Sequence, residues 1–121
     1  LPCTWSRNCA THFCSIGPDG TVGLCDCWVL AYPQECYGSI LEESLADLLA
    51  SNRRGEFLKR PEQLLCGECG ECEFLGFCFG GCPVRARGMS GEMGQKDGYC
   101  SLYKSLFAHV AGQMSAQLEE S

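Results

Sequence analysis

The sequence contains no run of 18 or more apolar residues, so it offers no ordinary transmembrane helix. It is also poor in basic residues, with 9 Lys and Arg against 15 Asp and Glu and a formal net charge of −6. Nucleic acids and anionic membrane surfaces require a basic face, so we expect no nucleic acid and no membrane as partner. Only two histidines occur, and we expect His12 and His109 to pack or lie at the surface rather than bind metal.

The beginning of the chain, LPCTWSRNC, lacks the basic and apolar regions of a signal peptide, so we expect no export. The first residue is Leu rather than Met, which favours a fragment or a processed product of a longer protein. At 121 residues the chain fits one domain with a modest core.

Cysteine, by contrast, is abundant and accounts for 12 of 121 residues. This density is typical of a disulfide scaffold or a metal protein. Five cysteines fall within CGECGECEFLGFCFGGC, residues 66–82.

The remaining pattern predicts a small α+β fold. Apolar runs on both sides of Gly17-Pro18-Asp19-Gly20 predict a β-hairpin, with Cys14 and Cys25 near its two ends. Residues 26–38 show no clear period and are expected to form a loop.

A capping-box pattern at Ser39-Ile40-Leu41-Glu42 predicts a helix start, and the helix is interrupted at residues 52–55. A short second helix is expected over 56–65, broken or restarted by Pro61. A Gly-rich loop follows at 88–98. From Tyr99 onward, apolar residues at every fourth position predict a C-terminal amphipathic helix whose stripe packs into the core. That stripe comprises Leu102, Leu106, Val110, Met114 and Leu118.

Disulfides, zinc and iron–sulfur clusters can each hold a cysteine-rich domain together. The C-x2-C-x2-C run makes poor local disulfides, because residues three apart pair only with strain. Zinc ribbons need two C-x2-C knuckles, and no second knuckle matches Cys69-x2-Cys72.

Iron–sulfur ligation fits the spacings better. The bacterial ferredoxin run is C-x2-C-x2-C-x3-C-P. Here Cys66-x2-Cys69-x2-Cys72 is followed, after an insertion, by Cys78-x3-Cys82-Pro83. Nearby glycines let backbone amides approach cluster sulfurs. Two clusters suit these spacings more readily than one.

The order Cys9-x10-Gly20-x4-Cys25, then Cys69-x2-Cys72-x5-Cys78-x3-Cys82, then Cys100 resembles the seven-cysteine signature of the SPASM domain. This domain is the C-terminal extension of many radical S-adenosylmethionine (radical SAM) enzymes. The segments CSIGPDGTVGLCD, SILEESLADLLAS and DGYCSLYKSLFAH are similar to those of anaerobic sulfatase-maturating enzymes and related peptide maturases.

This resemblance implies two auxiliary 4Fe-4S clusters. Cluster I would be held by Cys9, Cys14, Cys25 and Cys82, and cluster II by Cys69, Cys72, Cys78 and Cys100. Residues 1–121 would form one SPASM-like domain, with a cluster-binding core over 9–100 and a C-terminal helix over 101–121.

The resemblance also implies a general-base role for Asp26, which follows Cys25; a solvated loop aspartate is the alternative. Four cysteines remain outside the two sets: Cys3, Cys27, Cys36 and Cys66. We expect these to be spare thiols, with Cys27 or Cys36 as substitutes in cluster I and Cys66 as the substitute in cluster II.

The radical SAM motif C-x3-C-x2-C is absent from these residues, so S-adenosylmethionine would bind only in a core domain outside this sequence. The expected function is auxiliary: electron transfer from an oxidised intermediate and positioning of a peptide or protein substrate, with the core as partner in cis or in trans. The alternative is a metal-stabilised interaction module without a redox role. Thiolate ligands favour a reducing compartment, so we expect a cytoplasmic protein.

Overall fold

The computed structural model describes residues 3–120, so residues 1, 2 and 121 of the expected domain and C-terminal helix lie outside the described residues. The chain forms a small α+β structure with a three-stranded sheet.

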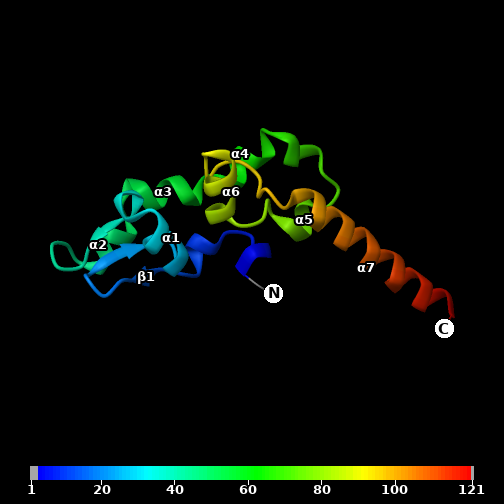
Figure 1. Ribbon diagram of the computed structural model, residues 1–121, viewed down its shortest axis with the longest axis horizontal. Helices are drawn as coiled ribbons and strands as arrows, with labels where there is room; N and C mark the ends of the chain where they lie inside the picture. Colours follow the sequence, from blue (N-terminus) through cyan, green and yellow to red (C-terminus); the bar gives the residue numbers. More distant parts are fainter. Residues whose placement is uncertain (1–2, 121) are drawn as a thin grey trace.

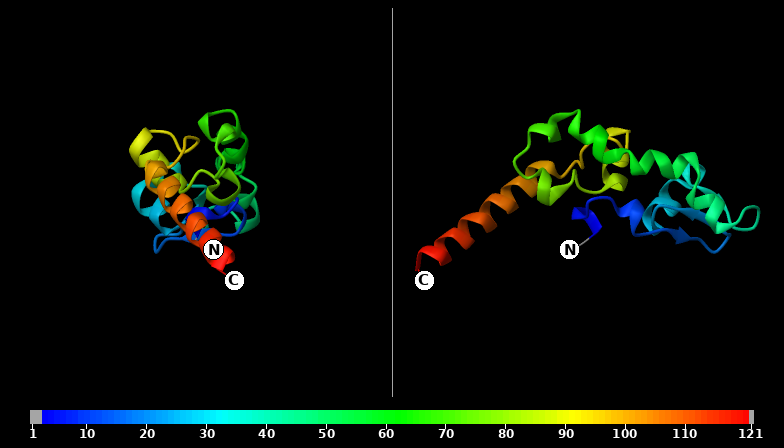
Figure 2. Two further views of the ribbon diagram at one scale, coloured as in Figure 1. Left: turned by 90° about the vertical axis from the view of Figure 1, so that its right-hand side faces the viewer. Right: turned by 180° about the vertical axis from the view of Figure 1, so that it is seen from behind.

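The first half holds η1 (Cys3–Trp5), η2 (Cys9–Thr11), β1 (Ser15–Ile16), β2 (Thr21–Gly23), α1 (Asp26–Ala31), η3 (Pro33–Glu35), β3 (Gly38–Ser39), α2 (Leu45–Leu49) and α3 (Asn52–Leu58). The second half holds α4 (Arg60–Leu65), η4 (Glu68–Glu71), α5 (Leu75–Cys78), α6 (Pro83–Ser90) and α7 (Cys100–Glu120). The sheet with α1, α2 and α3 lies at one end of the molecule, α4, α5 and α6 lie in the middle, and the long helix α7 extends at the other end (Figures 1 and 2).

The predicted hairpin is confirmed. β1 pairs antiparallel with β2, with Ile16 opposite Val22, and the turn places Gly20 at φ +91°. β3 adds a third antiparallel strand on the other side of β2. This strand was not predicted, because a two-residue pairing at Gly38 and Ser39 leaves no period in the sequence.

The expected loop over 26–38 is wrong in its first half, where α1 forms. Trp28 is buried on this helix and packs edge-on against Phe57, with ring centroids 4.8 Å apart. Its indole nitrogen donates to the Glu35 carbonyl at 3.0 Å. Burial of one large aromatic residue stabilises a helix too short to show an apolar period.

The expected helix start at Ser39 is also wrong. The helix begins after Ser44, whose hydroxyl accepts from the Asp47 amide at 3.2 Å. The expected interruption at 52–55 is the first turn of α3, which is capped by Ser51. The restart at Pro61 is confirmed, because Pro61 lies in the first turn of α4.

The main core lies between the sheet and helices α1, α2 and α3. Its buried members are Ala10, Val22, Leu24, Trp28, Tyr37, Leu48 and Phe57.

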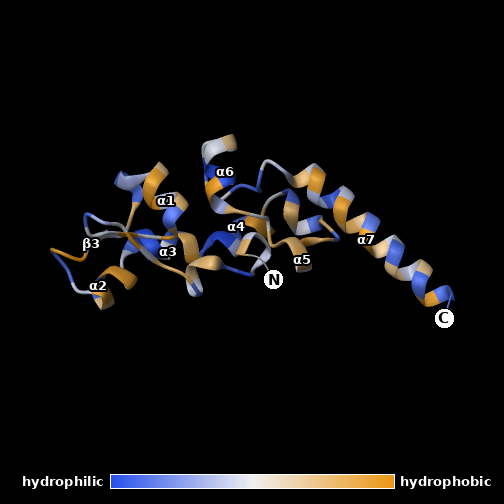
Figure 3. Ribbon diagram, turned by 60° about the horizontal axis from the view of Figure 1, so that its bottom comes forward, coloured by the Kyte–Doolittle hydropathy of each residue, from blue (hydrophilic) through white to orange (hydrophobic). Residues whose placement is uncertain are grey.

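The C-terminal helix is confirmed as α7, but its expected role in the core is wrong. Leu106 and Met114 are 42% and 60% exposed, and Leu102, Val110 and Leu118 are exposed as well. The helix extends beyond the body, and its outer turns carry apolar and polar segments in succession (Figure 3). The buried residue of α7 is Tyr103. No helix within residues 3–120 is long and apolar enough to cross a membrane.

Candidate functional site

The cysteines of this chain, all among the described residues, form no disulfides, and several of them lie in two groups. The second group is the simpler one. Four thiols line one cleft: Cys69, Cys72, Cys78 and Cys100. These are the residues predicted for cluster II.

Separate elements bring these four thiols together. Cys69 lies in η4, and Cys72 is the residue after it. Cys78 ends α5, and Cys100 is the first residue of α7. The cleft is therefore built by two short helical turns closing against the start of the long helix.

The electrostatics of the second group reflect this crowding. Burial raises the pKa of Cys69, and the neighbouring thiols of Cys100 and Cys72 raise it further. Burial also raises the pKa of Cys78, to which the Cys100, Cys69 and Cys72 thiols add. Clustered thiolates repel one another, so a bound cation that replaces their protons relieves the repulsion.

The first group contains Cys9, Cys25 and Cys82. Burial raises the pKa of Cys9 to about 11, with added contributions from Cys25, Cys82 and Cys3 and an opposing one from Arg60. Cys25 lies just before α1, and Cys82 just before α6. Three of the four thiols predicted for cluster I are thus neighbours.

Cys14, the fourth predicted ligand, is placed differently. It is exposed just before β1, and Cys3 is exposed as well. Burial raises the pKa of Cys9, and Cys25, Cys82 and Cys3 raise it further. Burial also raises the pKa of Tyr37, to which Cys9, Cys14 and Cys25 add, so Cys14 is in electrostatic reach of the same surroundings. Sequence reasoning passed over Cys3, because spacing alone does not show that the start of the chain folds back toward Cys82.

The substitute ligands also differ in position. Cys27 is exposed. Desolvation raises its pKa, and the charges of Asp26, Cys82 and Cys3 raise it further, so Cys27 lies beside the first group. Cys36 is half-buried, and its thiol donates to the Tyr32 carbonyl at 3.5 Å.

Cys66 is exposed at the end of α4. It lines a wide groove that also reaches Cys69. It therefore lies near the edge of the second group without lining the cleft that the four thiols share.

Asp26 is exposed at the start of α1. Its carboxylate accepts from the Cys27 amide at 2.9 Å, which suits the first turn of a helix. Its general-base role stays a prediction.

A tight turn directs Cys78 and Cys82 to different groups. Phe79, Gly80 and Gly81 have φ values of 51°, 79° and 73°, so three successive residues are left-handed. This conformation suits glycine and is strained for phenylalanine. The two thiols on either side of the turn consequently face different neighbours.

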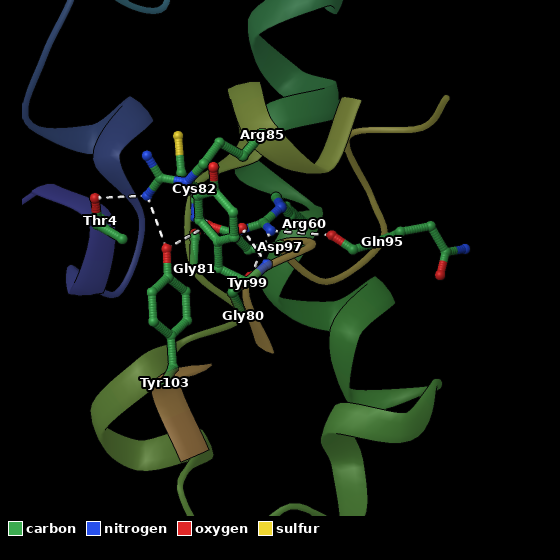
Figure 4. A network of polar contacts seen from close by, with 10 residues as sticks. All are labelled: Thr4, Arg60, Gly80, Gly81, Cys82, Arg85, Gln95, Asp97, Tyr99 and Tyr103. Atoms are coloured by element: carbon green, nitrogen blue, oxygen red, sulfur yellow. Dashed lines mark hydrogen bonds and ion pairs between the residues drawn. The ribbon is translucent and has the colours of Figure 1, made fainter. Parts of the chain in front are cut away.

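A buried polar network holds this turn in place (Figure 4). The Asp97 carboxylate, 1% exposed, accepts from the Cys82 amide and the Tyr99 amide, both at 2.9 Å. It also accepts from the Arg85 guanidinium and the Tyr103 hydroxyl at 2.9 Å. Burial would raise the pKa of Asp97, but these hydrogen bonds outweigh it and lower the pKa.

The donor chemistry of both groups fits iron–sulfur clusters. Each group brings several thiols together, and thiolates are the usual ligands of such clusters. Within residues 3–120, no three His, Cys, Asp or Glu side chains converge closely enough to hold a single metal ion. A tetrahedral zinc site needs sulfurs about 2.3 Å from one centre, whereas a four-iron cluster accepts thiolates that are farther apart.

Comparison with known proteins agrees with this chemistry. Residues 3–73 match the SPASM family, described as an iron-sulfur cluster-binding domain. The match begins at Cys3 and ends before Cys78, Cys82 and Cys100.

The chain is also similar to a serine-type anaerobic sulfatase-maturating enzyme from Bacteroides thetaiotaomicron, with 32% identity over 120 residues. The aligned part is 98% of this chain but 28% of that enzyme, so the chain spans less than a third of the relative's length. No solved structure matches the chain. The chain belongs to the SPASM family of iron–sulfur cluster-binding domains.

Proposed function

We propose that this chain is the auxiliary cluster domain, over residues 1–121, of a radical SAM enzyme that modifies a peptide or protein. The single observation that carries the proposal is the cleft shared by Cys69, Cys72, Cys78 and Cys100. The family match and the similarity to a maturase support it.

Two 4Fe-4S clusters are part of the proposal. Cluster II takes the four thiols of the cleft. Cluster I takes Cys9, Cys25 and Cys82, with Cys3 favoured over Cys14 as the fourth ligand because Cys3 lines one cleft with Cys9. Such clusters supply one-electron redox chemistry when bound.

This chain's own residues would shape the surroundings of that chemistry. Asp97 and the left-handed turn fix Cys82 away from the second cleft. Asp26, exposed beside the first group, would accept a proton from a substrate side chain held at that surface. The core domain would meet this chain in cis or in trans, in the reducing cytoplasm.

Metal analysis of the anaerobically reconstituted chain tests the proposal. We expect about eight irons and eight acid-labile sulfides per chain. Stoichiometric zinc without sulfide would show a structural metal module instead. For electron transfer, the bound clusters should be reduced and reoxidised with the circular dichroism spectrum unchanged, and irreversible loss of the fold on reduction would contradict that role.

A further inference from the structure

One buried cation lies between the two cysteine groups. Arg60, the first residue of α4, is 6% exposed. Its guanidinium donates hydrogen bonds to four backbone carbonyl oxygens: Met93 at 2.6 Å, Gly81 at 3.0 Å, Gly80 at 3.0 Å and Gln95 at 3.0 Å. It therefore joins the left-handed turn to the loop that follows α6 (Figure 4).

These hydrogen bonds orient the guanidinium but do not neutralise it. Among the described residues, the acceptors of Arg60 are all neutral carbonyls. Arg85 differs, because its guanidinium forms an ion pair with the Asp97 carboxylate at 2.9 Å. A buried charge without a bonded counter-ion is costly, so it needs negative charge nearby.

The Asp97 carboxylate supplies part of that negative charge, and the cysteines supply the rest when they ligate a cluster as thiolates. Arg60 lines the same cleft as Cys3 and Cys9. Burial lowers the pKa of Arg60, and charge interactions with Cys9, Cys82, Asp97 and Cys69 act in the opposite direction. Cys9 and Cys82 belong to the first group and Cys69 to the second, so the guanidinium is in electrostatic reach of both.

A cation at this position has a definite effect on an anionic cluster. Reduction adds an electron, and a nearby positive charge stabilises the reduced form more than the oxidised form. The effect becomes smaller as the distance between the charge and the cluster grows. Arg60 lines a cleft with Cys9 of the first group but does not line the cleft of Cys69, Cys72, Cys78 and Cys100, so its influence on the first group is larger.

We propose that Arg60 is a positioning residue whose fixed charge, held between the two thiol groups by backbone carbonyls, raises the reduction potentials of both clusters, and that of cluster I more. This inference rests on the proposed function. The guanidinium also helps both ligand sets to assemble, because it offsets repulsion among their thiolates.

An anaerobic redox titration followed by electron paramagnetic resonance tests the role of Arg60. The signal of cluster II is identified by its loss in Cys69→Ser. In Arg60→Gln, reduction of cluster I should become about tenfold less favourable, or about 59 mV lower for a one-electron couple. Cluster II should shift in the same direction by less. Unchanged potentials, or a larger shift of cluster II, would overturn the inference.

Two further variants separate charge from structure. Arg60→Lys keeps the positive charge but loses the planar guanidinium group, so the reduction potentials should be close to those of the wild type. Arg87→Gln is the matched control, because Arg87 is half-buried but already paired with Glu35 at 3.4 Å, and it should leave both potentials unchanged.

Loss of iron in Arg60→Gln does not end the test. Arg60→Lys then decides: full iron content with most of the wild-type potential retained supports the charge, and loss of iron or a potential lowered by about 59 mV or more overturns it. If the wild-type chain instead binds zinc and contains no sulfide, the proposed function itself is refuted. If the wild-type chain binds both clusters but Arg60→Gln leaves their reduction potentials unchanged, only the inference about Arg60 fails.

Discussion

Both the backbone conformation and the packing around residue 81 require a glycine there. Its φ is +73°, and a Cβ there would clash with the Asp97 side chain. Gly91 has φ +90° but open space around it. Gly91→Ala should therefore cost only the left-handed conformation, about 1 kcal/mol, whereas Gly81→Ala should cost at least about 3 kcal/mol. Denaturant unfolding of the two loaded variants measures the difference, and equal costs would contradict the packing at Asp97.

Asp97 offers a second test at this scale. Asp97→Asn keeps the shape but turns an NH2 group toward hydrogen-bond donors and leaves Arg85 without its counter-charge. We expect a loss of about 2–4 kcal/mol in the free energy of unfolding. Glu68→Gln is the control: its ion pair with Lys96 is at the surface, with Glu68 78% exposed, and the change should stay below about 1 kcal/mol. A loss as small as that of the control would show that the buried network is not stabilising.

The sequence predicted the cysteine-rich nature of the site but not the residues that hold it. Asp97 and Arg60 carry no motif, and each acts through backbone groups of other segments. Only the fold brings such partners together. Cys3 was missed for the same reason.

Among the elements, those with strong local signals were predicted correctly. The hairpin follows from the turn at residues 17–20, and the restart at α4 follows from Pro61. α1 and β3 were missed, because they depend on the burial of Trp28 and on pairing with β2. Tertiary contacts decide such short elements, and local propensity does not.

The long helix α7 is anchored by aromatic packing near its start. Phe107 packs against Trp5 and Phe74, with ring centroids 5.1 Å and 5.7 Å apart. Phe107→Ala should cost about 2–3 kcal/mol, whereas Leu106→Ala, at a residue 42% exposed, should cost less than about 1 kcal/mol. Thermal unfolding of both variants tests this order. A larger loss of stability in Leu106→Ala than in Phe107→Ala would contradict this order. It would indicate that the apolar stripe packs into the core, as the period of the sequence predicts.

In the whole molecule, each cysteine group joins segments that are distant in the sequence. Cys9 lies near Cys82, and Cys69 near Cys100. Ligands that bind only the folded chain stabilise it by mass action. Removing the clusters with a chelator under anaerobic conditions should therefore lower the melting temperature by at least about 10 °C. An unchanged melting temperature would show that the fold does not depend on them.

The most direct test of two separate sites is the iron and sulfide content of single-ligand variants. Cys9→Ser and Cys69→Ser each remove one thiol from one group, and Cys36→Ser, whose thiol contacts the Tyr32 carbonyl, is the control. We expect about four irons and four sulfides in each of the first two variants, and about eight of each in the control. Full iron content in Cys9→Ser or Cys69→Ser, or an equal loss in Cys36→Ser, would contradict two clusters held by these two groups of cysteines.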